Sequence, residues 1–233
     1  MNTLSESMPR PIVCYGGTFD PVHKGHLAVA RAVHDALDTP VHLLPAADPP
    51  HKGPTHANAE QRASMLALAI AGEPGLQLDR RELHREGPSY TIDTLRELRA
   101  ELGPDTPIIW MIGSDSLVEL DTWRCWRELF DYAHILAVQR PGSLTDGDSL
   151  AGRAPAVYAE IAPRQRRPSQ LQDSAAGGFA IFPLAEQRPE SSTELRRRLR
   201  EGEPWRDWVP VQVADYIDQH DLYRGRGVHT ASL

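Results

Sequence analysis

Two histidines and a pair of glycines lie close together near the start of the chain. Gly16 and Gly17 follow an apolar run, and His23 and His26 come shortly after them, three residues apart. Histidines at this spacing lie on one face of a helix, where their rings can donate hydrogen bonds to phosphate oxygens. A pair of surface histidines or half of a metal site also fits, but the H-E-x-x-H pattern of helical metal sites is absent. We therefore interpret this stretch as part of a phosphate-binding site.

The elements on either side of these residues predict a strand-to-helix turn. Residues 12–15 form an apolar run typical of a buried strand, and apolar residues recur at helical spacing over residues 27–37. Ligands of open α/β sheets bind at the carboxyl ends of the strands. Glycines allow a tight turn and a close approach of the backbone, and the N–H groups at a helix start attract anions. Thr18 and Phe19 belong to the same turn, which we expect to bind a nucleotide.

The complete string over residues 16–26, Gly-Gly-Thr-Phe-Asp-Pro followed by His-x-Gly-His, carries a family resemblance. It resembles the signature of the HxGH nucleotidyltransferase superfamily, and within it the bacterial nicotinate-nucleotide adenylyltransferases of NAD biosynthesis. The resemblance implies that the adenylyl group of ATP is transferred to nicotinate mononucleotide. The implied products are nicotinate adenine dinucleotide and pyrophosphate.

Alternating apolar runs and amphipathic segments predict the fold. Further strands are expected at 41–45, 76–79, 107–112, 133–139 and 179–183, and further helices at 58–71, 89–102 and 209–222. This order favours an α/β fold with a Rossmann-like, doubly wound, mainly parallel sheet and helices on both faces. We expect one nucleotidyltransferase domain over residues 10–224, with mobile tails at 1–9 and 225–233.

The resemblance implies that several loops contact the mononucleotide. Lys52 lies in a loop similar to the family's Pro-Pro-His-Lys/Arg loop, although residues 46–48 replace a frequent asparagine. Thr91 lies in a Ser-Tyr-Thr-x-Asp-Thr turn that implies a donor to the nicotinate ring and its carboxylate, and a helix cap at this position is compatible with that role. Trp123 is implied to stack on the pyridine ring. Arg140 follows a strand where the family also carries an arginine near the substrate.

A Gly-x-Asp motif follows the expected strand at 107–112. The resemblance implies that Gly113 allows a close backbone approach to ATP and that Asp115 binds ribose hydroxyls or positions a hydrated magnesium ion. Taken alone, Asp115 also fits a solvated cap of the next helix. Its place at the carboxyl end of a strand favours the functional interpretation.

A second motif for ATP lies near the end of the chain. Ser192, Thr193 and Arg196 are similar to the family's Ile-Ser-Ser-Thr-x-x-Arg motif, which implies that they hold the ATP phosphates. Ser191 three residues before a glutamate also fits a capping box that starts a helix. Glu190 departs from the family, in which a hydrophobic residue is usual, so local packing there is expected to be looser.

These residues predict a direct in-line attack of an anionic phosphate on the α-phosphate of ATP. We expect His23, His26 and Arg196 to be catalytic by stabilising charge on the triphosphate. Mg²⁺ is implied as a cofactor that bridges the phosphates and keeps several waters, so that few protein ligands are needed. No metal site built from protein ligands alone is expected.

Composition limits the kinds of partner. The 233 residues carry a net charge of −7 without a long basic tract, which argues against nucleic-acid binding. The two cysteines do not suggest a disulfide framework, and no apolar run is long enough for a membrane span. We expect a cytoplasmic protein that acts on the small molecules ATP and nicotinate mononucleotide. A homo-oligomer is compatible with the sequence.

Other functions fit the sequence less well. A phosphopantetheine adenylyltransferase is disfavoured by the greater length and by Trp123, and a cytidylyltransferase by the absence of its Arg-Thr-x-Gly-Ile string. A class I aminoacyl-tRNA synthetase lacks support because no matching lysine-rich second motif is present. A nucleotide-binding sensor without turnover remains an alternative.

Overall fold

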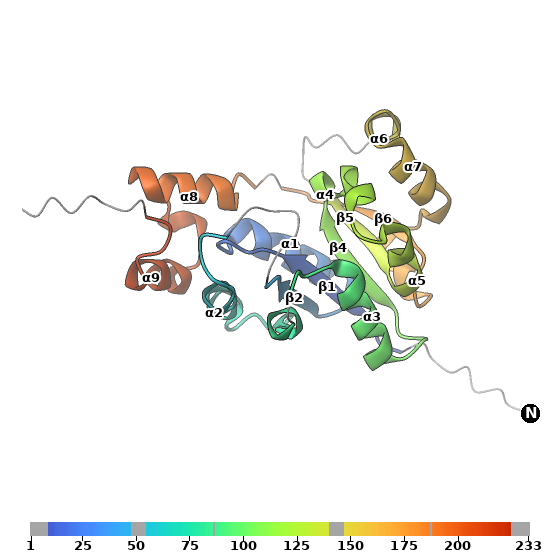
Figure 1. Ribbon diagram of the computed structural model, residues 1–233, viewed down its shortest axis with the longest axis horizontal. Helices are drawn as coiled ribbons and strands as arrows, with labels where there is room; N and C mark the ends of the chain where they lie inside the picture. Colours follow the sequence, from blue (N-terminus) through green and yellow to red (C-terminus); the bar gives the residue numbers. More distant parts are fainter. Residues whose placement is uncertain (1–8, 48–54, 86, 140–146, 187, 225–233) are drawn as a thin grey trace, which may run out of the picture.

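Six parallel strands form a single sheet in the spatial order β3-β2-β1-β4-β5-β6 (Figure 1). The computed structural model describes residues 9–47, 55–85, 87–139, 147–186 and 188–224. The strands are β1 (Ile12–Gly17), β2 (Val41–Pro45), β3 (Leu76–Leu78), β4 (Ile108–Gly113), β5 (His134–Gln139) and β6 (Phe179–Pro183). The strand order reverses between β1 and β4, so this part of the sheet is its topological switch point, where ligands of doubly wound folds bind.

Helices cover both faces of the sheet. They are α1 (Lys24–Leu37), α2 (Ala59–Ile70), α3 (Thr91–Leu102), α4 (Ser114–Val118), α5 (Leu129–Tyr132), α6 (Gly147–Arg153), α7 (Pro155–Ile161), α8 (Ser192–Glu201) and α9 (Val211–Gln219). Residues of α1, α2, α8 and α9 belong to one hydrophobic core, and residues of α3, α4, α5, α6 and α7 belong to another. Figure 1 shows α8 and α9 at one end of the molecule and α6 and α7 at the other.

The strands separate the two cores by alternating their side chains. In β4, Ile109 and Met111 enter the core with α1, whereas Ile108, Trp110 and Ile112 enter the core with α3. A strand buried on both faces requires a nearly continuous apolar run. This requirement explains why the sequence pattern of the central strands was easy to recognise.

The predicted fold and strands are confirmed, and most helices lie where they were expected. Asn58 and Gln61 cap α2 reciprocally, at 2.9 and 3.0 Å. Thr91, which also fitted a helix cap, is instead the first residue of α3. The cap residue is Tyr90, and its side chain makes no capping hydrogen bond. The final helix is shorter than the expected 209–222. The expected tails lie outside the described residues, apart from residue 9.

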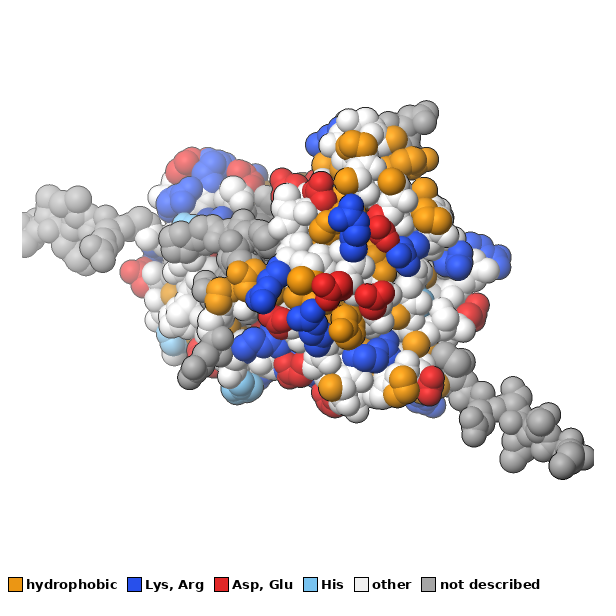
Figure 2. Space-filling view, turned by 45° about the vertical axis from the view of Figure 1, so that its right-hand side comes forward, with side chains coloured by type: hydrophobic (Ala, Val, Ile, Leu, Met, Phe, Trp, Pro, Cys, Tyr) orange, Lys and Arg blue, Asp and Glu red, His pale blue; other side chains and the backbone are white. Residues whose placement is uncertain are grey.

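Charged side chains of both signs are mixed over the face seen in Figure 2. Many of them form ion pairs, such as those of Arg81 with Asp79 and Glu101, at 2.8 and 3.0 Å. No helix in the described part of the chain is long and apolar enough to cross a membrane.

Candidate active site

The turn between β1 and α1 lies at the switch point and has little space for side chains. A Cβ on Gly16 would lie 2.5 Å from the indole ring of Trp110, and one on Gly17 would lie 2.9 Å from the ring of Phe19. Both separations are shorter than a van der Waals contact, so these two positions require glycine. The predicted glycine turn is thus explained by two aromatic rings that press against it.

Phe19 has a left-handed backbone, with φ of 49°, which is unusual for an aromatic residue. Its ring is 2% exposed and packs edge-on against Tyr15 and His26, with centroids 5.6 and 5.0 Å apart. Backbone strain of this kind persists only where the surroundings enforce it, and it is common at functional sites.

His23 and His26 cap the start of α1 reciprocally. The backbone N–H of His26 donates to Nδ1 of His23 at 3.3 Å, and the N–H of His23 donates to Nδ1 of His26 at 3.2 Å. The two rings stack with centroids 3.6 Å apart. Because each Nδ1 accepts a proton donor, a neutral ring in this arrangement carries its own proton on Nε2. His26 therefore presents an N–H donor on the side of its ring away from the cap.

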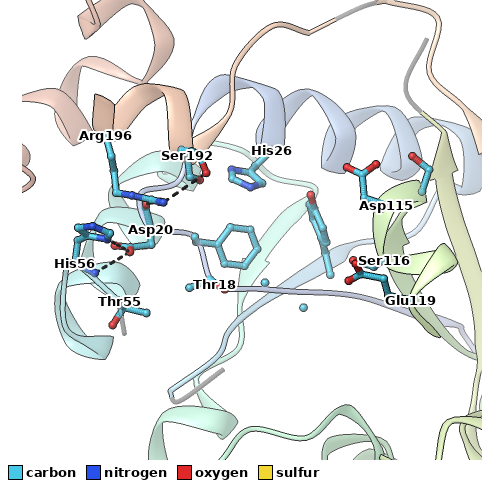
Figure 3. A pocket seen from close by; sticks show the side chains of 17 residues that line it. Thr18, Asp20, His26, Thr55, His56, Asp115, Ser116, Glu119, Ser192 and Arg196 are labelled. Atoms are coloured by element: carbon cyan, nitrogen blue, oxygen red, sulfur yellow. Dashed lines mark hydrogen bonds and ion pairs between the residues drawn. The ribbon is translucent and has the colours of Figure 1, made fainter. Parts of the chain in front are cut away.

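A cavity of about 670 Å³ opens over this turn (Figure 3). The residues that line it come from the β1–α1 turn, the segment before α2, the end of β4 and α4, and the start of α8. They are Tyr15, Gly16, Gly17, Thr18, Phe19, Asp20, His26, Thr55, His56, Gly113, Ser114, Asp115, Ser116, Glu119, Ser192, Thr193 and Arg196. We call it the larger cavity. It brings together ten of the eleven residues that were predicted to be catalytic or to bind ATP, and His23 is the exception.

The first turn of α8 is attached directly to the β1–α1 turn. The hydroxyl of Ser192 donates to the carbonyl oxygen of Pro21 at 3.0 Å, and the guanidinium of Arg196 donates to that of Asp20 at 2.6 Å. Ser191 caps α8 by accepting from the N–H of Glu194 at 3.2 Å. Two helix starts, those of α1 and α8, thus border one cavity, which suits a polyanion.

Asp20 connects this turn to the segment before α2 and to the end of the chain. Its carboxylate accepts from the N–H groups of His56 and Ala57, at 2.9 and 3.2 Å, and from the hydroxyl of Tyr223, at 2.8 Å. The Nδ1 of His56 lies 3.4 Å from the same carboxylate. Burial and the neighbouring Asp20 charge raise the pKa of Tyr223, so this phenol remains a hydrogen-bond donor.

The opposite end of the larger cavity is acidic. Asp115 and Glu119 lie one helical turn apart and point into it together with Ser116 (Figure 3). Among the described residues, no group of three His, Cys, Asp or Glu side chains could enclose a metal ion. Two carboxylates beside a phosphate cavity fit a divalent ion that is bound mainly by substrate oxygens and water.

A smaller cavity of about 210 Å³ adjoins the larger one. The two share Gly16, Gly17, Thr18, Gly113, Ser116 and Glu119. The other lining residues of the smaller cavity are Ala46, Glu82, Ser89, Thr91, Trp110, Met111, Ile112 and Trp123. Two indole rings and a helix start therefore border a space that suits a flat ring. Trp126 and Phe130 are buried in the core.

Glu82 is a buried carboxyl group at the edge of the smaller cavity. Burial raises its pKa, and hydrogen bonds from Thr94 and Ser89 together with the charge of Arg85 oppose that shift. The hydroxyl of Thr94 donates to Glu82 Oε1 at 2.7 Å. These contacts hold the start of α3, and with it Thr91, against the sheet.

The predicted residues differ in whether they line a cavity and whether they belong to the described part of the chain. Thr91 and Trp123 line the smaller cavity, and Lys52 and Arg140 lie outside the described residues. His23 is 1% exposed and lines neither cavity, so its direct contact with phosphate stays a prediction.

Several residues that line the cavities had no predicted role. Among them are Asp20, Thr55, His56, Glu82 and Glu119. Asp20 lies within the glycine and histidine motif, and this position could have indicated a role in the site. The partners of its side chain are 36 to 203 residues away in sequence, so spacing alone did not reveal them.

The chain resembles known proteins in both sequence and structure. A family model described as cytidylyltransferase-like matches residues 14–198. A probable nicotinate-nucleotide adenylyltransferase from Stenotrophomonas maltophilia is 47% identical, covering 91% of this chain and 96% of the relative. One from Marinobacter nauticus is 44% identical, covering 93% and 98%. The nicotinic acid mononucleotide adenylyltransferase of Plasmodium falciparum, solved in complex with NaAD, has a TM-score of 0.68 at 18% identity, covering 92% of this chain and 98% of that one.

Proposed function

The chain belongs to the nicotinate-nucleotide adenylyltransferase family, and we propose that it transfers the adenylyl group of ATP to nicotinate mononucleotide. The observation that carries the proposal is the pair of adjoining cavities that share the glycine turn. The larger cavity suits a triphosphate, and the smaller one suits a pyridine ring. A reaction between two nucleotides requires two adjoining binding sites. A protein that binds a single nucleotide has no need of a second one.

In the proposed reaction the phosphate of nicotinate mononucleotide attacks the α-phosphorus of ATP in line. A new P–O bond forms, the bond between the α-phosphorus and the bridging oxygen breaks, and pyrophosphate leaves with the electron pair. The attacking phosphate is anionic at neutral pH, so the protein has no need of a strong base. The protein instead positions both substrates and stabilises the negative charge on the phosphates.

We assign the charge-stabilising donors to both sides of the larger cavity. His26 donates from Nε2 and Arg196 from its guanidinium, and Thr18 and Thr193 bind phosphate oxygens. Ser192, whose hydroxyl donates to Pro21, contributes its backbone N–H at the start of α8. His23 acts with His26 through the reciprocal cap and the stacked ring. The backbone at Gly16, Gly17, Phe19 and Gly113 approaches ATP closely, and Asp115 binds the ribose.

The mononucleotide is assigned to the smaller cavity and its entrance. Trp123 stacks on the pyridine ring, and Thr91 at the start of α3 donates to the carboxylate. We propose Lys52 and Arg140 as cations for the same substrate. The family uses a divalent metal with ATP, and we propose Mg²⁺, which would lie near Asp115 and neutralise charge on the phosphates. We further propose that the protein works in the cytoplasm, where ATP is made.

The test follows the fate of the transferred group. ATP labelled in its α-phosphate is supplied with Mg²⁺ and nicotinate mononucleotide, and the dinucleotide and pyrophosphate are quantified. The proposal predicts label in the dinucleotide, in equal amount to the pyrophosphate released. ATP binding without any pyrophosphate release would favour a sensor and contradict the proposal.

A further inference from the structure

Arg62 of α2 is fully buried, although it carries a permanent charge. Its guanidinium donates to three backbone carbonyl oxygens, those of Thr18 at 2.7 Å, Ala47 at 3.0 Å and Ala57 at 3.3 Å. Burial lowers the pKa of Arg62, and the negative charge of Asp20 opposes that shift. Because burying a charge is costly and a well-packed apolar side chain often serves stability equally well, this position calls for a specific role.

The three acceptors belong to three separate segments around the candidate active site. Thr18 lies in the β1–α1 turn and lines both cavities, Ala47 follows β2, and Ala57 precedes α2. The fork of one guanidinium therefore fixes the separation of these segments. A lysine in its place offers a compact point charge and cannot reproduce the planar fork.

The backbone of Ala47 links Arg62 to the smaller cavity. Its carbonyl oxygen accepts from Arg62, and its N–H donates to the hydroxyl of Ser89 at 3.1 Å. Ser89 lines the smaller cavity and lies two residues before the start of α3. An unbroken chain of contacts thus joins Thr18 in the larger cavity to the start of α3 in the smaller one.

A second set of contacts fixes the same turn from its other side. The N–H of Ala57 donates to the carboxylate of Asp20 at 3.2 Å, while the carbonyl oxygen of Ala57 accepts from Arg62. The turn that contains Thr18 and Asp20 is therefore attached at both of these residues to the segment before α2.

We propose that Arg62 is a positioning residue that sets the two cavities relative to each other. The inference rests on the proposed function, in which one substrate lies in each cavity. Each substrate alone can bind to its own cavity, but the in-line attack requires both cavities in the correct relative position. Loss of the guanidinium should therefore lower kcat far more than it weakens the binding of either substrate alone.

The chain offers a matched control in Arg99. This arginine also donates to backbone carbonyl oxygens, but at the amino ends of the strands, away from both cavities. Its acceptors are Gly103, Pro104, Thr106, Tyr132 and Ala175. Arg62→Lys and Arg99→Lys thus remove the same kind of contact, the first at the carboxyl ends of the strands and the second at their amino ends.

Steady-state kinetics and calorimetry with each substrate alone test the inference. Arg62→Lys should lower kcat on the order of 10²-fold, while the Kd of ATP and of nicotinate mononucleotide each change less than about 3-fold. Arg99→Lys should lower Tm comparably and leave kcat within about 2-fold. An unchanged kcat in Arg62→Lys, or an equal loss in Arg99→Lys, would overturn the inference. Ser89→Ala breaks the same chain without leaving a buried charge, and it should lower kcat in the same direction.

Amide hydrogen exchange of the protein without substrates separates this inference from the proposed function. In Arg62→Lys, the amides of residues 16–19, 46–47 and 89–91 should all exchange faster, whereas Arg99→Lys should leave them unchanged. Unchanged exchange in Arg62→Lys would refute the positioning role even if the enzyme is active. A wild-type protein that releases no pyrophosphate would refute the proposed function, and the exchange result would still decide the role of Arg62.

Discussion

Each imidazole of the histidine pair uses one nitrogen for the fold. Nδ1 of His23 and Nδ1 of His26 both accept backbone N–H groups at the start of α1, so phosphate binding falls to Nε2 of His26. The spacing of three residues predicted a shared helix face. The structure adds that His23 is the cap residue before the helix and that the two rings stack.

The role of His26 leads to a prediction about catalysis. His26→Ala removes one oriented donor, and we expect kcat to fall on the order of 10²–10³-fold. His220→Ala, at the end of α9 and absent from the lining of both cavities, is the control and should retain wild-type turnover. Near-wild-type kcat in His26→Ala would remove His26 from the mechanism.

The close contact at Gly16 leads to a prediction about packing. Gly16→Ala places a methyl group 2.5 Å from the buried ring of Trp110, and relieving this overlap should cost about 1–3 kcal/mol of stability. It should also lower kcat/KM, because both residues border the smaller cavity. Gly152→Ala is the matched control, since a Cβ there meets nothing within 4 Å. Urea unfolding of both variants decides the matter, and equal stability would contradict the packing argument.

At the scale of elements, a buried carboxyl group lies directly before α8. The residue before its cap, Glu190, is 7% exposed, and its Oε2 has no hydrogen-bond partner among the described residues. The sequence had shown a glutamate where the family usually has a hydrophobic residue. The structure shows that this side chain is nevertheless buried.

Replacing this carboxylate should stabilise the protein. Glu190→Ile removes an unsatisfied buried group, and we expect a gain of about 1–3 kcal/mol in the free energy of unfolding. Glu190→Gln, which removes the charge but keeps a polar amide, should gain less. Chemical denaturation measures both variants, and a loss of stability in Glu190→Ile would show that the carboxylate has a stabilising partner.

A pH dependence follows from the carboxylate on the outer face of α8. Hydrogen bonds from Arg197 and Arg198 lower the pKa of Glu194 to about 2, from an ordinary value of 4.5. A lowered folded-state pKa contributes stability above the unfolded-state value, and that stability is lost as the pH falls from about 4.5 toward 2. Glu194→Gln should therefore flatten the pH dependence of Tm across this window. The same slope of Tm against pH in the wild type and in Glu194→Gln would contradict this prediction.

At the scale of the whole molecule, the sequence predicted the sheet because its central strands are buried on both faces. Runs such as residues 108–112 must be apolar throughout, and glycines must follow where aromatic rings approach the backbone. The motifs at strand ends and helix starts then placed most of the candidate site. These features depend on residues that are close in sequence, so their patterns predict the structure.

The remaining features depend on contacts between distant residues. Arg62 has the sequence context of an ordinary charged residue on an amphipathic helix, but its acceptors include Thr18, 44 residues away. Tyr223 reaches Asp20 across 203 residues. Neither contact leaves a periodic signal in the sequence. The prediction of one domain over residues 10–224 agrees with the segments that these contacts connect, and it stays a prediction.

The most direct measurement of the central claim is pyrophosphate release with ATP and Mg²⁺ and three acceptors offered in parallel. The acceptors are nicotinate mononucleotide, nicotinamide mononucleotide and phosphopantetheine. We predict strong preference for the first, because in the proposed site Thr91 would donate to its carboxylate and Trp123 would stack on its ring. Turnover with phosphopantetheine alone, or no release with any acceptor despite ATP binding, would contradict the account.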